Sequence, residues 1–96
     1  FVVPFLEDPN NRVRANAIVA LRTYKLVKLD VPLKGMLTHK DPLMRRSAIW
    51  AITEIRNARY VKLLRVLAAD KDKKVKRQAV EAIHLLAAEG FSEAQI

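Results

Sequence analysis

Basic side chains recur at a fixed spacing in two stretches of the chain. Lys28 aligns with Arg59, and Lys34 with Arg65, at an offset of 31 residues. A fifth basic residue, Lys62, falls between Lys34 and Arg65 in the sequence and on the same side of the predicted helix. At about 100° per residue they gather on the helix face opposite Leu33 and Leu64. Such a surface attracts polyanions, for example a nucleic-acid backbone, an acidic peptide or anionic lipid headgroups. The alternative is a solvated face that only keeps the chain soluble.

Trp50 is the only tryptophan of the chain, and its position contradicts its apolar character. Its equivalents at the same offset are Val19 and Glu81, on the polar side of a predicted helix. A position that accepts glutamate is not part of a core, so we expect the indole to be exposed. An exposed tryptophan is a typical anchor for a protein partner. Alternatively, Arg46 lies one turn earlier and stacks on the ring.

Residues suited to catalysis are few and scattered. His39 and His84 are the only histidines, they fall in different units, and there is no cysteine. Without a carboxylate cluster to complete a metal site or a triad, we predict no catalytic residue, metal or cofactor. The nearest candidate for a carboxylate in the basic region is Asp30. Because it precedes Val31 and Pro32, we interpret it as the N-cap of a helix.

These side chains must be positioned by a repeated helical unit. Segments 13–21, 44–52 and 75–83 align at an offset of 31 residues, with apolar residues at the i, i+3, i+4, i+7 spacing of a helix. A weaker apolar pattern follows each segment, so each unit is predicted to be a helical hairpin. The aligned apolar positions include Ala17/Ala48/Ala79 and Ala20/Ala51/Ala82 in the first helices, and Leu29/Tyr60/Phe91, Leu33/Leu64 and Met36/Leu67 in the second.

The register gives a single domain of stacked units. Its predicted parts are residues 1–8 as the end of a preceding repeat, 9–38 as repeat 1, 39–69 as repeat 2 and 70–96 as repeat 3. Half-units at both ends, and a first residue other than methionine, indicate a piece of a longer array. The ends would expose Val2 and Phe5 on one side and Phe91 and Ile96 on the other, which predicts end-to-end self-association.

One polar pattern repeats together with the apolar one. The chain has Asn10, Asp41 and Asp72 at the predicted start of each first helix, four residues before Arg14, Arg45 and Lys76 respectively. An acid or amide there caps the free N–H groups, and we expect the basic residue to reach back to it. This ladder is interpreted as structural. Its cations could bind phosphates only if their acidic partners left them free.

Composition excludes several classes of protein. The chain has 96 residues and a net charge of +8, and a domain of this size buries only about 60% of its unfolded surface. A large enclosed catalytic cavity is therefore not expected. No stretch approaches the ~18 uninterrupted apolar residues of a membrane span. The lack of cysteine leaves no disulfide and fits a cytoplasmic location.

Three strings resemble HEAT repeats, most closely the short bacterial type related to the repeats of phycobilin lyases: Asp8 to Leu21, Asp41 to Ile52 and Asp72 to Ile83. The similarity covers nearly the whole chain. The period is shorter than the roughly 40 to 47 residues of typical HEAT units, and the third string lacks the proline after its aspartate. The resemblance implies an all-α, right-handed α-α superhelix, with first helices outside and second helices lining a concave groove. It implies no particular activity.

We therefore expect a non-enzymatic scaffold domain of a larger protein. It would bind a protein partner, or another domain of its own chain, through the basic groove or the convex face. The alternative is binding of a nucleic-acid backbone, or another polyanion, by the basic groove. A third possibility, an alkylpurine DNA glycosylase or bilin lyase relative, would need a carboxylate or histidine with free access to the groove. The predicted partner-binding residues are Lys28, Lys34, Trp50, Arg59, Lys62 and Arg65.

Overall fold

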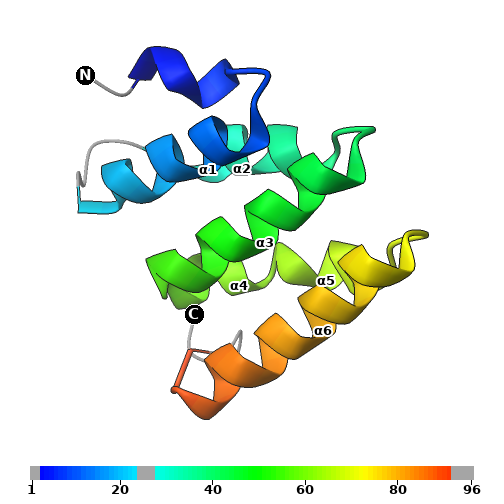
Figure 1. Ribbon diagram of the computed structural model, residues 1–96. Helices are drawn as coiled ribbons and strands as arrows, with labels where there is room; N and C mark the ends of the chain where they lie inside the picture. Colours follow the sequence, from blue (N-terminus) through cyan, green and yellow to red (C-terminus); the bar gives the residue numbers. More distant parts are fainter. Residues whose placement is uncertain (1–2, 24–27, 92–96) are drawn as a thin grey trace.

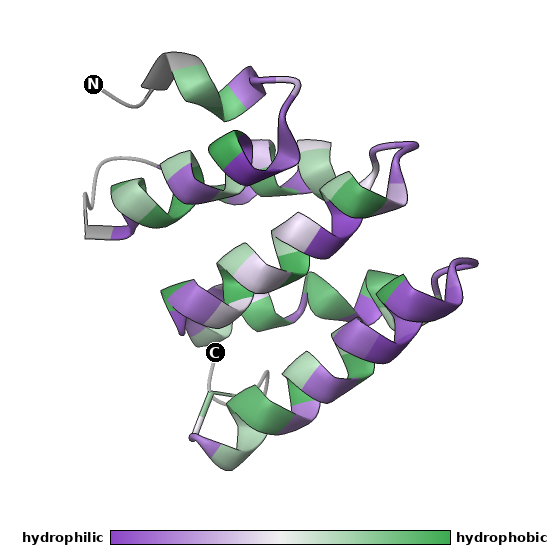
Figure 2. Ribbon diagram, viewed as in Figure 1, coloured by the Kyte–Doolittle hydropathy of each residue, from purple (hydrophilic) through white to green (hydrophobic). Residues whose placement is uncertain are grey.

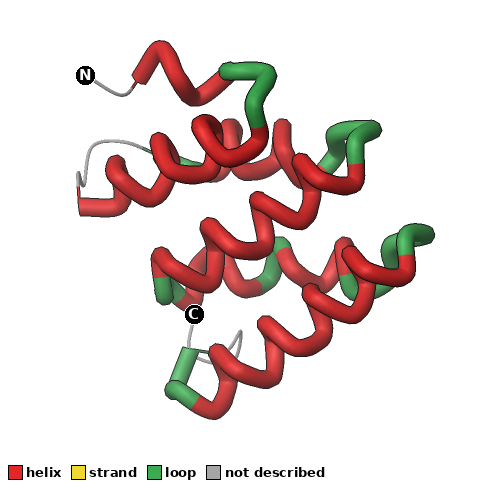
Figure 3. The backbone as a smooth tube through the Cα atoms, viewed as in Figure 1, coloured by secondary structure: helices red, strands yellow, loops and turns green. Residues whose placement is uncertain are grey.

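Helices build the whole described part of the chain. The computed structural model describes residues 3–23 and 28–91, and every regular element within them is helical (Figure 3). In chain order the elements are η1 (Val3–Glu7), α1 (Asn11–Ala20), η2 (Leu21–Thr23), α2 (Asp30–Leu37), α3 (Pro42–Ile55), α4 (Ala58–Val61), α5 (Leu64–Leu67) and α6 (Lys73–Ala88). The predicted all-α class is confirmed.

The helices form two layers (Figure 1). The first helices of the three units, α1, α3 and α6, lie side by side in one layer, and α2, α4 and α5 lie behind them. Within the front layer α3 packs against both α1 and α6, while α2 packs on α3 and α5 on α6. The described part measures 33 × 29 × 16 Å, and its thinnest dimension suits two interlocking layers of helices.

Each first helix begins at the residue that the sequence predicts. The Asn10 side chain accepts from the N–H groups of Arg12 and Val13, at 2.9 and 3.1 Å. At the start of α3 the Asp41 side chain accepts the N–H of Leu43, and at the start of α6 that of Asp72 accepts the N–H groups of Lys74 and Val75. These bonds satisfy backbone donors that have no partner within the helix. The three predicted caps are therefore confirmed.

The core lies between the two layers, and Figure 2 shows hydrophobic and hydrophilic residues interspersed along the helices that enclose it. Ala17, Ala48 and Ala79 are all buried, which brings the first helices close together. The aligned apolar positions of the second helices are also buried: Leu29, Tyr60, Leu33, Leu64, Met36 and Leu67. The alignment therefore identified most of the core, but Ala20 is exposed although its equivalents Ala51 and Ala82 are buried.

The second helices differ from the prediction in two ways. Asp30 is the first residue of α2 rather than its N-cap, which is Leu29, and so Lys28 precedes the helix. An aspartate in the first turn still suits the helix dipole, so both placements satisfy the same sequence signal. The second helix of repeat 2 is divided into α4 and α5. There the N–H groups of Leu63 and Arg65 donate to carbonyls three residues back, at 3.1 and 3.2 Å, which tightens the turn.

One end of the stack exposes positions that are buried elsewhere. Val13 is 36% exposed, whereas its equivalents Met44 and Val75 are 1% and 0% exposed, because α1 and α3 respectively cover them. Phe5, 45% exposed, and Val13 line a surface depression of about 380 Å³. The predicted apolar face at this end is confirmed, while Val2 lies outside the described residues.

At the other end of the described chain, α6 terminates at a glycine. Gly90 adopts a φ of +94°, in the region that favours glycine. The N–H of Phe91 then donates to the carbonyl of Leu86 at 2.7 Å, and the Phe91 ring packs partly buried against the core. The expectation that Phe91 forms an open end is therefore only partly met, and Ile96 lies outside the described residues. None of the described helices has the length and apolar character needed to cross a membrane.

Candidate binding surfaces

The five predicted basic residues all lie exposed on the rear layer of the molecule. Lys34 belongs to α2, Arg59 to α4 and Arg65 to α5, while Lys28 precedes α2 and Lys62 lies in the turn between α4 and α5. The opposite sides of these elements are buried against the front layer, through residues such as Leu33 and Leu64. The side chains therefore point away from α1, α3 and α6. We call this set of five residues the basic face.

The basic face has little negative charge of its own. Within residues 28–37 and 58–67 the single carboxylate is that of Asp30. Its Oδ1 lies 3.6 Å from Nη2 of Arg59, so this ion pair joins the start of α2 to α4. Because Lys28 lies two residues before Asp30, the pair also brings Lys28 and Arg59 into one neighbourhood. All five cations are exposed, and the acid within these two ranges is partly buried.

Apolar groups accompany the cations, but stacking surfaces do not. Val31 and Val66, on α2 and α5, are 78% and 66% exposed. Tyr60, the aromatic residue of this region, is only 7% exposed, as its register predicts, although the Arg59 guanidinium lies 5.9 Å from the centre of its ring. A buried ring cannot offer its face to a base. The arrangement suits contact with charged groups better than readout of a sequence.

Trp50 lies on the opposite side of the molecule, in the layer of first helices. Its side chain is 41% exposed, as predicted. It borders a depression of about 450 Å³ between α3 and α6, which Glu81 and Leu85 also line. Trp50 also lines a second depression of about 150 Å³, together with Arg12 and Ser47. Residues of the basic face line neither depression, so the two candidate surfaces are separate.

The predicted stacking of Arg46 on the indole is wrong. The Nε of Arg46 donates to Oε1 of Gln78 at 2.9 Å, and the Gln78 amide donates back to the Arg46 carbonyl at 3.1 Å. This reciprocal pair joins α3 to α6 in a partly buried setting and commits the guanidinium. The exposed indole therefore remains available to a partner.

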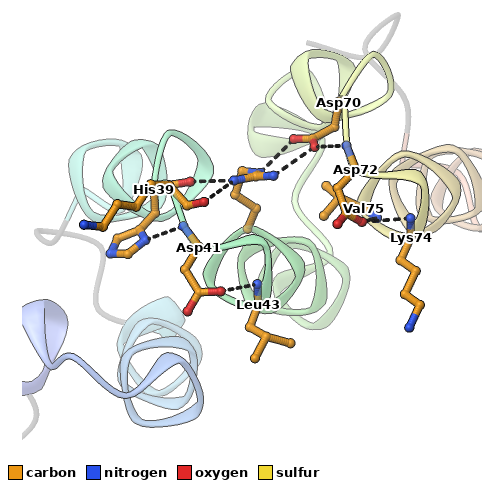
Figure 4. A network of polar contacts seen from close by, with 9 residues as sticks. His39, Asp41, Leu43, Asp70, Asp72, Lys74 and Val75 are labelled. Atoms are coloured by element: carbon orange, nitrogen blue, oxygen red, sulfur yellow. Dashed lines mark hydrogen bonds and ion pairs between the residues drawn. The ribbon is translucent and has the colours of Figure 1, made fainter.

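One step of the predicted polar ladder, at Arg45, links two successive repeats, but not through the predicted pairing (Figure 4). Arg45 does not reach back to Asp41. Its Nε and Nη2 bind the two oxygens of Asp70, 25 residues later, at 2.8 and 3.0 Å. Its Nη1 donates to the carbonyls of His39 and Lys40. The Asp41 side chain accepts the N–H of Leu43, while the arginine binds the carboxylate of the next repeat.

The Arg45–Asp70 pair is nearly enclosed, with side-chain exposures of 7% and 8%. Burial by itself raises the pKa of the Asp70 carboxyl. The hydrogen bonds from Arg45 and from the N–H of Asp72, together with the charge of Arg45, outweigh burial and lower that pKa below its ordinary value of 3.8. Asp70 is therefore a charged structural link between repeats 2 and 3.

The histidines serve no shared site. Nδ1 of His39 accepts the N–H of Asp41 at 3.0 Å, and His84 is exposed on α6. Within residues 3–23 and 28–91, no three His, Cys, Asp or Glu side chains are grouped so that they could hold a metal ion.

Comparison with known proteins agrees with this architecture. A family model described as HEAT repeats matches residues 29–90. The chain is also 34% identical over 84 residues to epoxyqueuosine reductase of Bacillus subtilis (strain 168), a match that covers 84% of this chain and 22% of that enzyme. The chain thus spans about a fifth of the length of this relative. No solved structure matches the chain. The family match covers most of the chain and falls on the stacked hairpins, so the chain belongs to the HEAT-repeat family and folds as an α-α solenoid.

Proposed function

We propose that this chain is a non-catalytic binding domain of a longer protein and that its basic face holds the phosphate backbone of a nucleic acid. The observation that carries this proposal is the exposure of five cations, on neighbouring elements, with one carboxylate among them. The net charge of +8 adds long-range attraction for a polyanion. Backbone binding needs no stacked aromatic rings, and the basic face offers none.

The relative fits a division of labour within the longer protein. Its name states that it reduces epoxyqueuosine, and this chain corresponds to about a fifth of it. We propose that a catalytic activity of the longer protein belongs to its other parts, while the HEAT domain holds the partner. A cytoplasmic location, as expected from the lack of cysteine, suits this role.

A catalytic role for the basic face itself has less support. A glycosylase or bilin lyase type of site would need a carboxylate or histidine with free access. The carboxylate available, Asp30, has its Oδ1 buried and faces Arg59 at 3.6 Å. Such an acid is held in a structural contact rather than presented to a substrate.

The test is a salt titration of binding to random duplex DNA and to RNA. If all five cations contact phosphates, the logarithm of the association constant falls against the logarithm of salt concentration with a slope of about −3 to −5. The double variant Lys34→Glu/Lys62→Glu is expected to bind at least tenfold more weakly and to lose about two units of slope. Its matched control is Lys73→Glu/Lys74→Glu, which changes the net charge equally at the start of α6 in the other layer.

Equal weakening in both double variants would show that only net charge matters and would contradict the proposal. Absence of salt-sensitive binding in the wild-type chain would also contradict it. Emission from Trp50 is expected to stay unchanged on binding, because the indole lies in the opposite layer.

A protein partner is the second candidate, favoured by Trp50. The indole and Leu85, 41% and 48% exposed, border one depression between α3 and α6, with the Glu81 carboxylate beside them. An apolar anchor beside a charge is typical of protein-binding hot spots. A partner bound there would change Trp50 emission and would be lost in Trp50→Ala, whereas the basic-face variant would still bind it.

A further inference from the structure

Residues 8, 39 and 70 occupy equivalent positions in the three repeats. Each lies two residues before a helix cap and accepts the backbone N–H of that cap through its side chain. The bonds are Asn10 N–H to Asp8 Oδ1 at 2.8 Å, Asp41 N–H to His39 Nδ1 at 3.0 Å, and Asp72 N–H to Asp70 Oδ1 at 2.9 Å. The imidazole of His39 thus stands where the other repeats have a carboxylate.

The histidine at position 39 matters because the equivalent residue in repeat 3, Asp70, accepts hydrogen bonds from an arginine of the preceding repeat. Arg45 in repeat 2 directs its Nε to Asp70 in repeat 3. By the same register, the residue that corresponds to Asp70 for Arg14 in repeat 1 is His39 in repeat 2. The Nε of Arg14 is buried and has no hydrogen-bond partner among the described residues. The Nε of Arg14, which lacks an acceptor, is therefore equivalent to the Nε of Arg45, which binds Asp70.

His39 adds a second donor instead of an acceptor. Since its Nδ1 accepts the N–H of Asp41, the proton of the neutral ring lies on Nε2. Aligned with Asp70, His39 therefore offers an N–H where Arg45 finds a carboxylate oxygen. A buried donor without an acceptor is unfavourable, and a charged donor more so.

We infer that Arg14 and His39 form a binding site for an oxyanion, either a carboxylate or a phosphate group, which takes the place that the Asp70 carboxylate has between repeats 2 and 3. Both residues are partly rather than fully buried, so the site lies near the surface, although the Nε of Arg14 itself is covered. The site lies at the starts of α1 and α3 and uses no residue of the basic face. It therefore does not depend on the proposed nucleic-acid binding.

The test compares thermal unfolding of three proteins, the wild-type chain, Arg14→Gln and His39→Asp, at neutral pH. Each is unfolded in sodium chloride, sodium acetate and sodium phosphate at equal ionic strength and followed by helical circular dichroism. The wild-type midpoint is expected to rise in acetate, in phosphate or in both, and the comparison identifies the preferred oxyanion. His39→Asp supplies an internal carboxylate, so its midpoint in chloride is expected to exceed that of the wild type and to gain nothing specific from either anion.

Arg14→Gln is expected to lose the anion response as well, although its midpoint in chloride does not rise. The general effect of each salt appears in all three proteins and is subtracted. In the wild-type chain the Nε–H resonance of Arg14, assigned by its loss in Arg14→Gln, is expected to shift with anion concentration. Equal anion responses in wild type and His39→Asp, or no response in the wild type, would overturn the inference. The His39→Asp comparison stands even if Arg14→Gln does not fold.

Discussion

Arg14 and Arg45 have the same side chain at the same place in successive repeats, but different surroundings. Arg45 holds both oxygens of Asp70 and two backbone carbonyls. For Arg14 the equivalent position in the next repeat is a histidine, His39, and its Nε has no hydrogen-bond partner among the described residues. A buried ion pair stabilises only when its hydrogen bonds are complete. One residue at position 39 therefore decides whether the junction of two repeats is closed from within or open to an outside anion.

Replacing Asp70 by asparagine tests the closed junction. The substitution keeps an acceptor for the N–H of Asp72 but removes the charge that Arg45 binds. We expect the free energy of unfolding at neutral pH to fall by about 2 kcal/mol, as for loss of a hydrogen-bonded charge. Urea denaturation followed by circular dichroism measures it. The exposed Glu81, changed to glutamine, is the control and is expected to leave the unfolding free energy within about 0.5 kcal/mol.

The same pair gives a pH dependence of defined sign. Because the pKa of Asp70 is lower in the folded chain than in the unfolded chain, its contribution is fully present above the unfolded pKa, near 4. That contribution is lost as the pH falls through the folded value. Below about pH 4 the difference in unfolding free energy between wild type and Asp70→Asn should therefore shrink. A difference that stays constant into strong acid would contradict the assigned role.

At the scale of the elements, local signals predicted the first helices well. Their caps and their apolar stripes are both encoded within one unit, so a single alignment reveals them. The partner of Arg45 was not predictable in the same way, because Asp70 lies in the next repeat and becomes a neighbour only through stacking. Arg46 was misjudged for the same reason, since Gln78 reaches it from another helix.

The second helices carry weaker local signals, and prediction was less accurate there. Asp30 satisfies the start of α2 either as cap or as first residue, and sequence alone does not separate the two. The division between α4 and α5 contains no glycine or proline, so the sequence has no signal that predicts it. Exposure of the basic face followed from the register, whereas its binding role stays a prediction.

A single cap can be tested apart from the neighbouring ion pair. Asp72→Ala removes the acceptor for the N–H groups of Lys74 and Val75 at the start of α6. The backbone N–H of residue 72 remains and still binds Asp70. We expect a loss of about 1 kcal/mol of unfolding free energy, measured by urea denaturation. The exposed neighbour Lys73→Ala is the control, and a loss of the same size there would contradict the capping role.

At the scale of the whole molecule, net charge and exposed apolar surface have opposite effects on self-association. The net charge of +8 keeps copies apart in low salt. The end that carries Phe5 and Val13 has an apolar depression of about 380 Å³. Met44 and Val75, the equivalents of Val13 in the other repeats, are buried. Salt screens the repulsion but leaves the apolar attraction. Association should therefore depend on both concentration and ionic strength.

We predict that light scattering detects association of the chain at high concentration and high salt. Val13→Lys is expected to reduce it at least tenfold with little change in stability, because Val13 is already 36% exposed. Leu43→Lys is the control, since Leu43 is 54% exposed on α3 and does not line this depression. A wild-type chain that stays monomeric under these conditions, or equal effects of the two variants, would contradict the prediction.

The packing of each first helix on its neighbour in the stack also affects how the chain folds. The main packing pairs, α1 with α3 and α3 with α6, join units that are adjacent in sequence. Short sequence separation lowers the entropy lost in closing each loop, which favours rapid folding. In an array of this kind folding can nucleate in one unit and spread to the next. Because Arg45 and Asp70 hold repeats 2 and 3 together, we expect folding to begin there and repeat 1, where the Nε of Arg14 has no partner, to open first.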